Sequence, residues 1–531
     1  MITSRTMVFY ITRLSFLALG LTLALTFVIT SCSEVEANKT VWADSIRFGT
    51  GTPLQTFDPH QADTGPSFST YLALVYDGLT RQDPDNPGNI VPALATDWYW
   101  IDDVTLEFEI RQGVRFIDGT PFDARVAKDN IERMLRLKGP RISTVAAIKS
   151  VEAPNEFILR MQLQYPDPTI LYNLSLSPGM MVSPAAFENE DLDLNPVGTG
   201  AWRYDRERST IGEVHRFYVN PDYFAGRSQE RANYEVLVLG DGPARLNALL
   251  SGQVDLTIVG PAEARYAEQS GFSIARRDNR WLGMTILDRE GEIVPELADR
   301  RVRRALGFAV DRQAMADIVF FGYATPASQP MAELGHVSGL QNFFTYDPDK
   351  ARKLLEDAGA IGFSFTVPIT PGYSAPYETI QYYLRKVGIN MELKVIEPGT
   401  VSPVSRSKQY PVNTIGYPTF DPDSRHLAIW DSDAAFNPFR NDNSRLDELA
   451  KIARETHDES ERQRLFKEYF EIVVAEVYSV VYLHIEDLIA YDAGRVMDVR
   501  VSRYIDPMLR EVKLRDMKPR ESIATEEAQI R

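Results

Sequence analysis

The sequence contains one cysteine, Cys32, among its 531 residues. A single thiol excludes an intrachain disulfide and a zinc site built from several thiolates. The sequence also lacks an excess of positive charge, because 57 Lys and Arg residues stand against 74 Asp and Glu residues, for a formal net charge of −17. Proteins that bind a phosphate backbone need a clustered basic surface, so we expect no nucleic-acid partner.

Sequence motifs for catalysis are absent as well. There is no G-x-S-x-G nucleophile elbow, no G-x-x-x-x-G-K-[ST] phosphate loop and no G-x-G-x-x-G after the first expected strand. The six histidines include no H-E-x-x-H pair, so we expect neither a metal site nor a cofactor. Asp421 and Asp423 are a candidate acid pair, but acids that flank a proline commonly form turns. We therefore expect a binding protein rather than an enzyme, which would need a nucleophile or acid–base pair that the sequence does not display.

The N-terminal segment has the layout of a secretory signal. Its only charges up to Ser33 are Arg5 and Arg13, and an uncharged apolar run then leads to Cys32. The residues at 29–31, an aliphatic residue and two small ones, resemble the lipobox of bacterial lipoprotein signal peptides. This resemblance implies removal of residues 1–31, acylation of Cys32 and an exported, extracytoplasmic protein held on a membrane by lipid. The alternative is an uncleaved anchor helix, because about 20 apolar residues suffice to cross a bilayer.

The rest of the chain alternates strand and helix patterns, which predicts an α/β protein of two or three domains. Helix signals are clear at 348–358, where Asp347 provides an N-cap, Pro348 takes the first position and Gly359 ends the helix. Further helices are expected after Asp123, at 299–310, and as a hairpin at 444–454 and 460–477. Strands are expected at 45–49, 105–111, 157–163, 235–239 and 391–396.

An ordered series of short motifs runs through most of the chain. It comprises TFDPH at 56–60, VYDGLT at 75–80, VPALATDW at 91–98, IRQGVRFIDGTPFDA at 110–124, NPVGTGAWRY at 195–204, NPDYFAG at 220–226, RLNALLSGQVDL at 245–256 and RRVRRALGFAVDRQ at 300–313. Together these motifs resemble the family-5 extracellular solute-binding proteins of bacterial ABC importers, of the oligopeptide- and dipeptide-binding type.

The resemblance implies a two-lobed α/β fold of the periplasmic-binding-protein type II, which closes about a hinge. Lobe I is then expected at 44–280 and 485–516, with an extra subdomain at about 66–193. Lobe II is expected at 281–484. Residues 32–43 would form a tether, and residues 517–531, which have almost no apolar content, a flexible tail.

Ligands of this family lie between the lobes, against the loop after D-P-H and a lobe II segment of the form G-W-x-x-D. The Asp of that segment binds the α-amine of a peptide. Here Gly416 and Tyr417 match, but Phe420 stands at the position of the Asp, and Asp421 follows one residue later. A buried ammonium without a carboxylate costs several kcal/mol, so a peptide amine would need Asp421 or another acid.

Other candidate ligand-binding residues are Asp63 and Gly65 in the first loop, and Trp281 and Trp430 in lobe II. The flat faces of the two tryptophans suit sugars, rings or peptide backbone, and packing of the lobe is their alternative role. His60 is a weaker candidate, since Asp58 and Pro59 also fit a structural turn.

The function that the resemblance implies is a monomeric, cofactor-free receptor. It would capture an oligopeptide or similar solute and deliver it to the permease and ATPase subunits of an importer. One alternative keeps the fold but assigns a non-peptide solute, such as an oligosaccharide, an opine-like compound or a chelated metal. Another is a lipoprotein sensor or adhesin that works without an importer.

Overall fold

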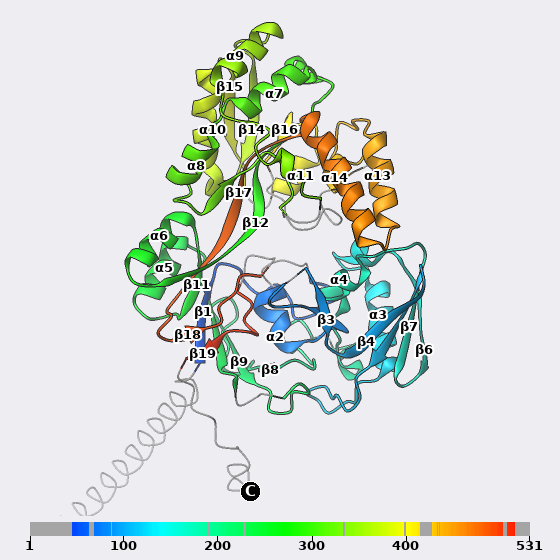
Figure 1. Ribbon diagram of the computed structural model, residues 1–531. Coiled ribbons are helices and arrows are strands. Elements are labelled where there is room, and N and C mark those ends of the chain that lie inside the picture. The colour runs from blue at the N-terminus through cyan, green and yellow to red at the C-terminus, as the bar shows by residue number, and fades with distance from the viewer. Residues whose placement is uncertain are drawn as a thin grey trace, which may run out of the picture.

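Figure 1 shows the computed structural model of the chain. The structure describes residues 45–62, 68–86, 88–189, 191–226, 230–332, 335–397, 400–414, 427–432, 434, 436–502 and 507–515. The expected signal, the tether and Cys32 lie outside the described residues, as does the expected tail. Among the described helices, none combines the length and apolar character needed to span a membrane.

Helices begin where the sequence provides caps. In α9 (Pro348–Asp357) the Asp347 side chain accepts a hydrogen bond from the backbone N–H of Lys350 at 2.9 Å, and Gly359 follows with a φ of 66°. In α3 (Ala124–Leu137) the Asp123 side chain accepts from two backbone N–H groups of the first turn. The other expected helices are α7 (Arg300–Phe308), α13 (Ser444–Arg454) and α14 (Glu459–Ala475). Their bounds agree with the expected ones to within about two residues.

Lobe I is built on the largest described sheet. Strand β1 (Ser45–Thr50) lies between β10 (Asn233–Val238) and β11 (Leu256–Val259) and runs parallel to both. Beyond β10, β9 (Val214–Val219) and β8 (Trp202–Tyr204) continue the sheet in antiparallel order. Helices α5 (Gly242–Leu250) and α6 (Pro261–Gln269) pack beside this sheet at the edge of lobe I (Figure 1).

A second sheet lies within the range expected for the subdomain. Its antiparallel strands follow the order β4 (Ala95–Asp102), β5 (Thr105–Ile110), β7 (Ile158–Leu163) and β6 (Ile148–Asn155). Alternate residues of these strands and the apolar face of α3 form one core, which includes Leu106, Phe108, Ile131 and Met161. The subdomain therefore has its own core and lies beside the main sheet of lobe I (Figure 1).

Two long strands join the lobes. Strand β12 (Ser273–Ile286) and strand β17 (Ser479–Tyr491) pair antiparallel along nearly their whole length. At one end β17 pairs with β11 of lobe I, and its middle pairs with β13 (Ala324–Pro326). At the lobe II end β16 (Val412–Asn413) pairs with β12. In Figure 1 the two strands cross together from the lower lobe to the upper one. We call this pair the hinge ribbon; both expected lobe boundaries fall inside it.

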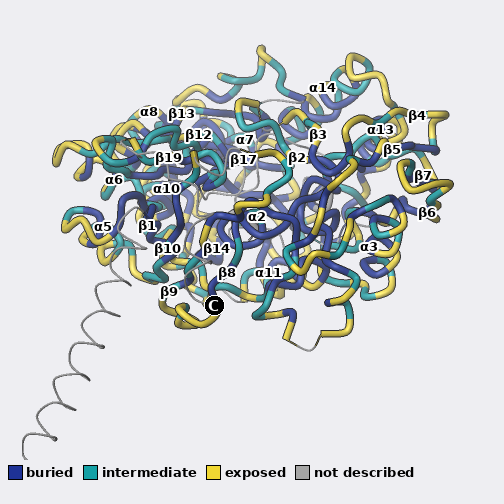
Figure 2. The backbone as a smooth tube through the Cα atoms, turned by 90° about the horizontal axis from the view of Figure 1, so that it is seen from below, coloured by how far each residue is buried: buried dark blue, intermediate teal, exposed yellow. Residues whose placement is uncertain are grey.

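Lobe II carries two cores on the far end of the hinge ribbon. One lies around the parallel pair β14 (Ser364–Ile369) and β15 (Asn390–Val395), covered by α7, α8 (Arg312–Ile318), α9 and α10 (Ser374–Lys386). The other lies under the α13–α14 hairpin. Figure 2 shows buried segments through the interior of the molecule and exposed ones at its periphery.

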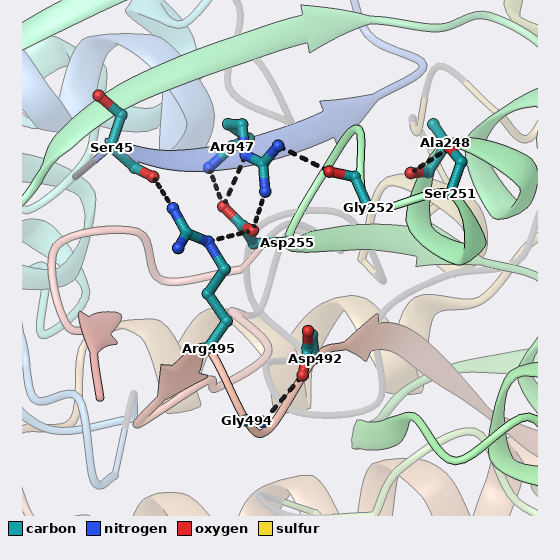
Figure 3. Close-up of polar contacts among 9 residues, drawn as sticks. All are labelled: Ser45, Arg47, Ala248, Ser251, Gly252, Asp255, Asp492, Gly494 and Arg495. Atoms are coloured by element: carbon teal, nitrogen blue, oxygen red, sulfur yellow. Dashed lines mark hydrogen bonds and ion pairs between the residues drawn. The ribbon is translucent and has the colours of Figure 1, made fainter. Parts of the chain in front are cut away.

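The chain that follows β17 returns to lobe I, where Asp255 holds it through Arg495 (Figure 3). The carboxylate of Asp255 accepts hydrogen bonds from the Arg47 guanidinium at 2.6 Å and from Arg495 Nε at 2.7 Å. Arg495 also donates to the backbone carbonyl of Ser45 at 3.2 Å, and Arg47 to that of Gly252 at 2.6 Å. One buried acid thus joins β1, the turn before β11 and the chain beyond β17.

Candidate functional site

A polar cluster occupies the hinge ribbon where the chain passes between the lobes. Arg280 of β12 donates a hydrogen bond to Asp487 Oδ1 of β17 at 2.5 Å, and Asn279 donates to Asp487 Oδ2 at 2.8 Å. Asn279 also donates to the carbonyl of Ser502 in lobe I at 2.9 Å. The strand register shifts between Asp278 and Arg280, a β-bulge that marks a local bend. The cluster fixes both crossing strands to lobe I at this bend.

Arg280 also reaches lobe II. Its guanidinium donates to the hydroxyl of Tyr373 at 3.0 Å. Desolvation by itself would lower the pKa of Arg280, but the nearby Tyr373 and Asp487 outweigh it and raise that pKa above its usual value. The guanidinium therefore stays charged at any physiological pH. It connects Tyr373 of lobe II with the carboxylate of Asp487 in the hinge ribbon.

The lobes meet a second time, at the end remote from the hinge ribbon. His457, between α13 and α14 of lobe II, donates from Nε2 to the carbonyl of Asp103 at 3.1 Å. Its imidazole also packs on Trp100, with ring centroids 4.6 Å apart. Trp100 and Asp103 belong to the β4–β5 hairpin of the subdomain. We call this contact the clasp.

The D-P-H motif forms a buried structural network within lobe I. Both carboxylate oxygens of Asp58 accept from Arg133 of α3, at 2.9 and 2.8 Å. Arg133 also donates to His60 Nδ1 at 2.9 Å, so Nε2 carries the proton and donates to the carbonyl of Met180 at 3.1 Å. Burial, aided by the Arg133 charge, lowers the pKa of His60 to about 4. The contacts of His60 thus lie within the protein.

Most residues expected to contact the ligand fall outside the described residues. This holds for Asp63 and Gly65 in the loop after D-P-H. It holds equally for Gly416, Tyr417, Phe420 and Asp421 in lobe II. The structure does describe the residues that precede each segment. Ala62 ends the D-P-H turn, and Val412–Asn413 pair with the lobe II end of β12. The described residues also contain no group of three His, Cys, Asp or Glu side chains placed to hold a metal ion.

Comparison with known proteins assigns this two-lobed arrangement to a family. The profile of the bacterial extracellular solute-binding proteins, family 5, middle, matches residues 89–436. The chain belongs to this family. The solute-binding protein is 27% identical over 379 residues to the glutathione-binding protein GsiB of Pectobacterium atrosepticum, which covers 68% of this chain and 71% of that protein.

Solved structures of the same type confirm the α/β, two-lobed fold. NikA from Brucella suis in complex with Fe(III)-EDTA superposes with a TM-score of 0.79 at 21% identity, over 88% of this chain and 99% of that chain. DppA from Helicobacter pylori in complex with the peptide STSA gives a TM-score of 0.72 at 21% identity, over 89% and 98% of the two chains.

Trp281 and Trp430 lie in the core of lobe II. Both side chains are fully buried in the cluster under the α13–α14 hairpin. Trp430 Nε1 donates to the Ser479 hydroxyl at 3.1 Å, and its ring contacts Phe470 edge-on, with centroids 5.9 Å apart. In this structure the two tryptophans of the solute-binding protein pack the lobe, the alternative role that their sequence allowed.

Sequence reasoning missed the residues that connect the lobes. Arg280 and Asp487 are 207 positions apart, and nothing local pairs them. A signal was nevertheless present, since Asp487 interrupts the apolar strand β17, where an ionised group requires a partner. His457 of the clasp carried no such signal, because it lies in an exposed polar turn.

Proposed function

We propose that this solute-binding protein is the receptor of an ABC importer, and that it captures an oligopeptide or similar solute between lobe I and lobe II. The hinge ribbon carries this proposal, because two paired strands with a bulge form a connection that bends while the rest of each lobe stays packed. A solute that contacts both lobes stabilises the closed form, and the permease and ATPase subunits respond to that form. The protein works as a monomer and without a cofactor.

We place the solute-binding site on two segments, one that follows the D-P-H turn of lobe I and one that follows β16 of lobe II. Asp63 and Gly65 continue from the D-P-H turn, which Arg133 fixes to α3. Tyr417 and Asp421 follow the β16 strand at the end of the hinge ribbon. In this proposal Asp421 neutralises the amine of a peptide, and Tyr417 packs on its backbone. The relatives support a peptide solute, since one is a glutathione-binding protein and another was solved with a peptide.

Gly416, Phe420, Trp281 and Trp430 have supporting roles in the same proposal. Gly416 and Phe420 belong to the lobe II segment itself. Trp430 ends α12 (Leu427–Trp430), the first described element after that segment, and it is anchored by Ser479 of β17. In this proposal Trp430 anchors the chain that follows the segment to the hinge ribbon, and Trp281 of β12 packs in the same core.

A non-peptide solute is the second candidate, and Phe420 favours it. Phe420 stands where the resemblance places an amine-binding acid, and a buried amine without an acid is strongly disfavoured. NikA from Brucella suis, which was solved with Fe(III)-EDTA, shows that this fold accommodates a chelated metal. An oligosaccharide or an opine-like compound belongs to the same candidate class.

The first experiment is mass spectrometry of small molecules released by denaturing the purified protein. The wild type is compared with a Tyr417→Ala, Asp421→Ala double variant, and Asp423→Ala is the matched control in the same segment. Recovery of short peptides from the wild type and the control, but not from the double variant, is expected. A sugar, opine or chelate lost in the same way would replace the peptide assignment. A protein that releases no solute would contradict capture.

We also propose that the protein is exported and held on the membrane by lipid on Cys32. Two or more acyl chains give durable anchoring, since each buried methylene contributes about 0.8 kcal/mol. Intact-mass analysis of protein from the membrane fraction is expected to show a chain that begins at Cys32 and carries lipid. The variant Cys32→Ser is expected to lose the lipid. A mature chain that retains residues 1–31 would instead identify an uncleaved anchor.

A further inference from the structure

A polar cavity of about 380 Å³ lies within lobe I. Its walls come from the hairpin of β2 (Thr80–Gln82) and β3 (Ile90–Pro92), from residues 223–225 and 230–231, and from residues 510–513. None of the residues proposed for the solute lines it, and every lining residue belongs to lobe I. The cavity is therefore separate from the proposed solute site.

The cavity concentrates positive charge in an acidic protein. Five cationic side chains line it, against two carboxylates, in a chain with a formal net charge of −17. The cations are Arg81, Arg111, Arg231, Arg510 and Lys513, and the carboxylates are Glu230 and Glu511. A local excess of cations held in a concave site attracts anions more strongly than the same charges on an open surface.

Arg510 is fixed deep in this wall by a buried acid. It donates to Asp77 Oδ1 at 2.6 Å and to the Tyr223 hydroxyl at 3.1 Å. The Asp77 side chain is 1% exposed, whereas that of Arg510 is 18% exposed. Asp77 thus positions the guanidinium without covering it, and part of Arg510 remains accessible from the cavity.

Two further guanidinium groups lie on aromatic faces. Arg231 is 4.9 Å from the ring centroid of Tyr223, and Arg111 is 5.3 Å from that of Phe224. Within the described part of the chain, the guanidinium of Arg231 donates only to the carbonyl of Gly226, and that of Arg111 only to the carbonyl of Ala93. Each guanidinium has five N–H donors, so both retain donors for a ligand. Burial lowers the pKa of Arg231, and the charge of Arg510 lowers it further, an energetic cost that a bound anion would relieve.

We propose that this cavity binds a phosphate-bearing ligand, either a free phosphate compound or the headgroup of a phospholipid. Planar guanidinium groups bind phosphate oxygens in pairs, and stacking on an aromatic ring fixes their planes in advance. The volume lies within the range of about 300–1,000 Å³ that is typical of small-molecule sites. Arg81 and Lys513 are exposed at the rim, where their partners Glu511 and Asp498 lie 3.8 and 3.0 Å away. These rim pairs are open to exchange with an entering anion.

Isothermal titration calorimetry at low salt tests this site on the purified protein, because screening by salt weakens exposed charge contacts. One titrant is inorganic phosphate, and the other is glycerophosphoglycerol, the deacylated headgroup of phosphatidylglycerol. Saturable binding is expected, and Arg231→Gln is expected to weaken it at least tenfold. The matched control Arg125→Gln removes the same charge from a side chain that is 70% exposed on lobe I, and its affinity should equal that of the wild type.

The titrants separate the two sources of phosphate. Tighter binding of inorganic phosphate would assign a free compound, and tighter binding of the headgroup would assign a lipid surface. If Arg231→Gln has an altered circular dichroism spectrum or thermal midpoint, Arg111→Gln replaces it. The absence of binding for both titrants, or equal affinity in wild type and a folded cavity variant, would overturn the proposal. Loss of solute binding leaves this result unaffected, since the two sites share no residue.

Discussion

Arg280 and Asp487 form an ion pair between the two strands that join the lobes. The Asp487 side chain is 1% exposed and that of Arg280 is 28% exposed, so the carboxylate is shielded from water while the guanidinium is partly accessible. Asn279 satisfies the second oxygen of the same carboxylate. This buried polar cluster fixes the alignment of the two strands where the register of the ribbon shifts and the protein must bend.

The substitution Asp487→Asn is expected to lower the free energy of unfolding by about 3–5 kcal/mol, because it leaves the Arg280 charge without its carboxylate. Urea unfolding measures the change. Arg276→Gln on the partner strand β12 is the control, since Arg276 is 58% exposed and its Nε lies 3.7 Å from Glu486. The arginine of this pair is largely exposed and its contact with Glu486 is long, so the pair is expected to contribute less than about 1 kcal/mol. A similar loss of unfolding free energy in both variants would show that the Asp487 pair contributes no more than an ordinary ion pair.

The variant His457→Ala is expected to shift the protein toward an open form, because it removes both contacts of the clasp. The lost hydrogen bond and ring contact correspond to about 1–2 kcal/mol, or roughly a tenfold change in the balance of open and closed forms. Small-angle X-ray scattering would show a larger radius of gyration than in the wild type. Lys451→Ala, at an exposed position of α13, is the control and should leave the radius unchanged. A compact His457→Ala variant would show that the clasp does not hold the lobes together.

Replacement of Asp255 by Asn is expected to lower the free energy of unfolding by about 3 kcal/mol, since two partly buried arginines then lose the buried carboxylate that pairs with both. The loss should be accompanied by faster hydrogen exchange in β1 and in the segment after β17, which Asp255 connects. Asp222→Asn provides the comparison, because Asp222 also pairs with an arginine but is 81% exposed. Uniform exchange along the chain would contradict a local role for Asp255.

Stability is expected to fall as the pH falls from about 6.5 to about 4. Burial lowers the pKa of His60, His215 and His484 to about 4, whereas an unfolded histidine titrates near about 6.5. Between these values the unfolded chain binds protons that the folded chain does not, so acid favours unfolding by up to about 1.4 kcal/mol per pH unit for each histidine.

The variant His215→Gln tests this pH dependence, because it removes one of the three groups. His215 is fully buried, and its Nδ1 lies 3.1 Å from the Tyr204 hydroxyl, which an amide can also bind. Urea unfolding at a series of pH values should give a slope that is smaller by about 1.4 kcal/mol per pH unit than in the wild type. An unchanged slope would mean that His215 is protonated in the folded protein.

The sequence predicted what is encoded locally. Asp123 and Asp347 mark helix starts because a cap needs only the residues beside it. The family motif at 195–204 likewise has a local cause, because a Cβ on Gly198 or Gly200 would lie less than 3 Å from the backbone of Val75. The family motifs supplied the two-lobed fold, which no single pattern contained.

The candidate site was less accessible to sequence reasoning. The partners of Asp58 and Asp487, namely Arg133 and Arg280, are 75 and 207 positions away, and only the assembled sheets bring them together. The aromatic character of Trp281 and Trp430 fitted a binding role and a packing role equally, and only their complete burial in lobe II distinguishes the two in the described structure.

The late position of β17 in the chain constrains the order in which the protein assembles. Strand β11 of lobe I has β17 as its antiparallel neighbour, and the strand arrives more than 200 residues later in the sequence. Lobe II, by contrast, contains β14 and β15 with their helices in one continuous stretch. When the chain emerges from its N-terminus, the sheet of lobe I therefore keeps an unpaired edge until the last tenth or so of the chain has followed, and non-local pairing of this kind folds slowly.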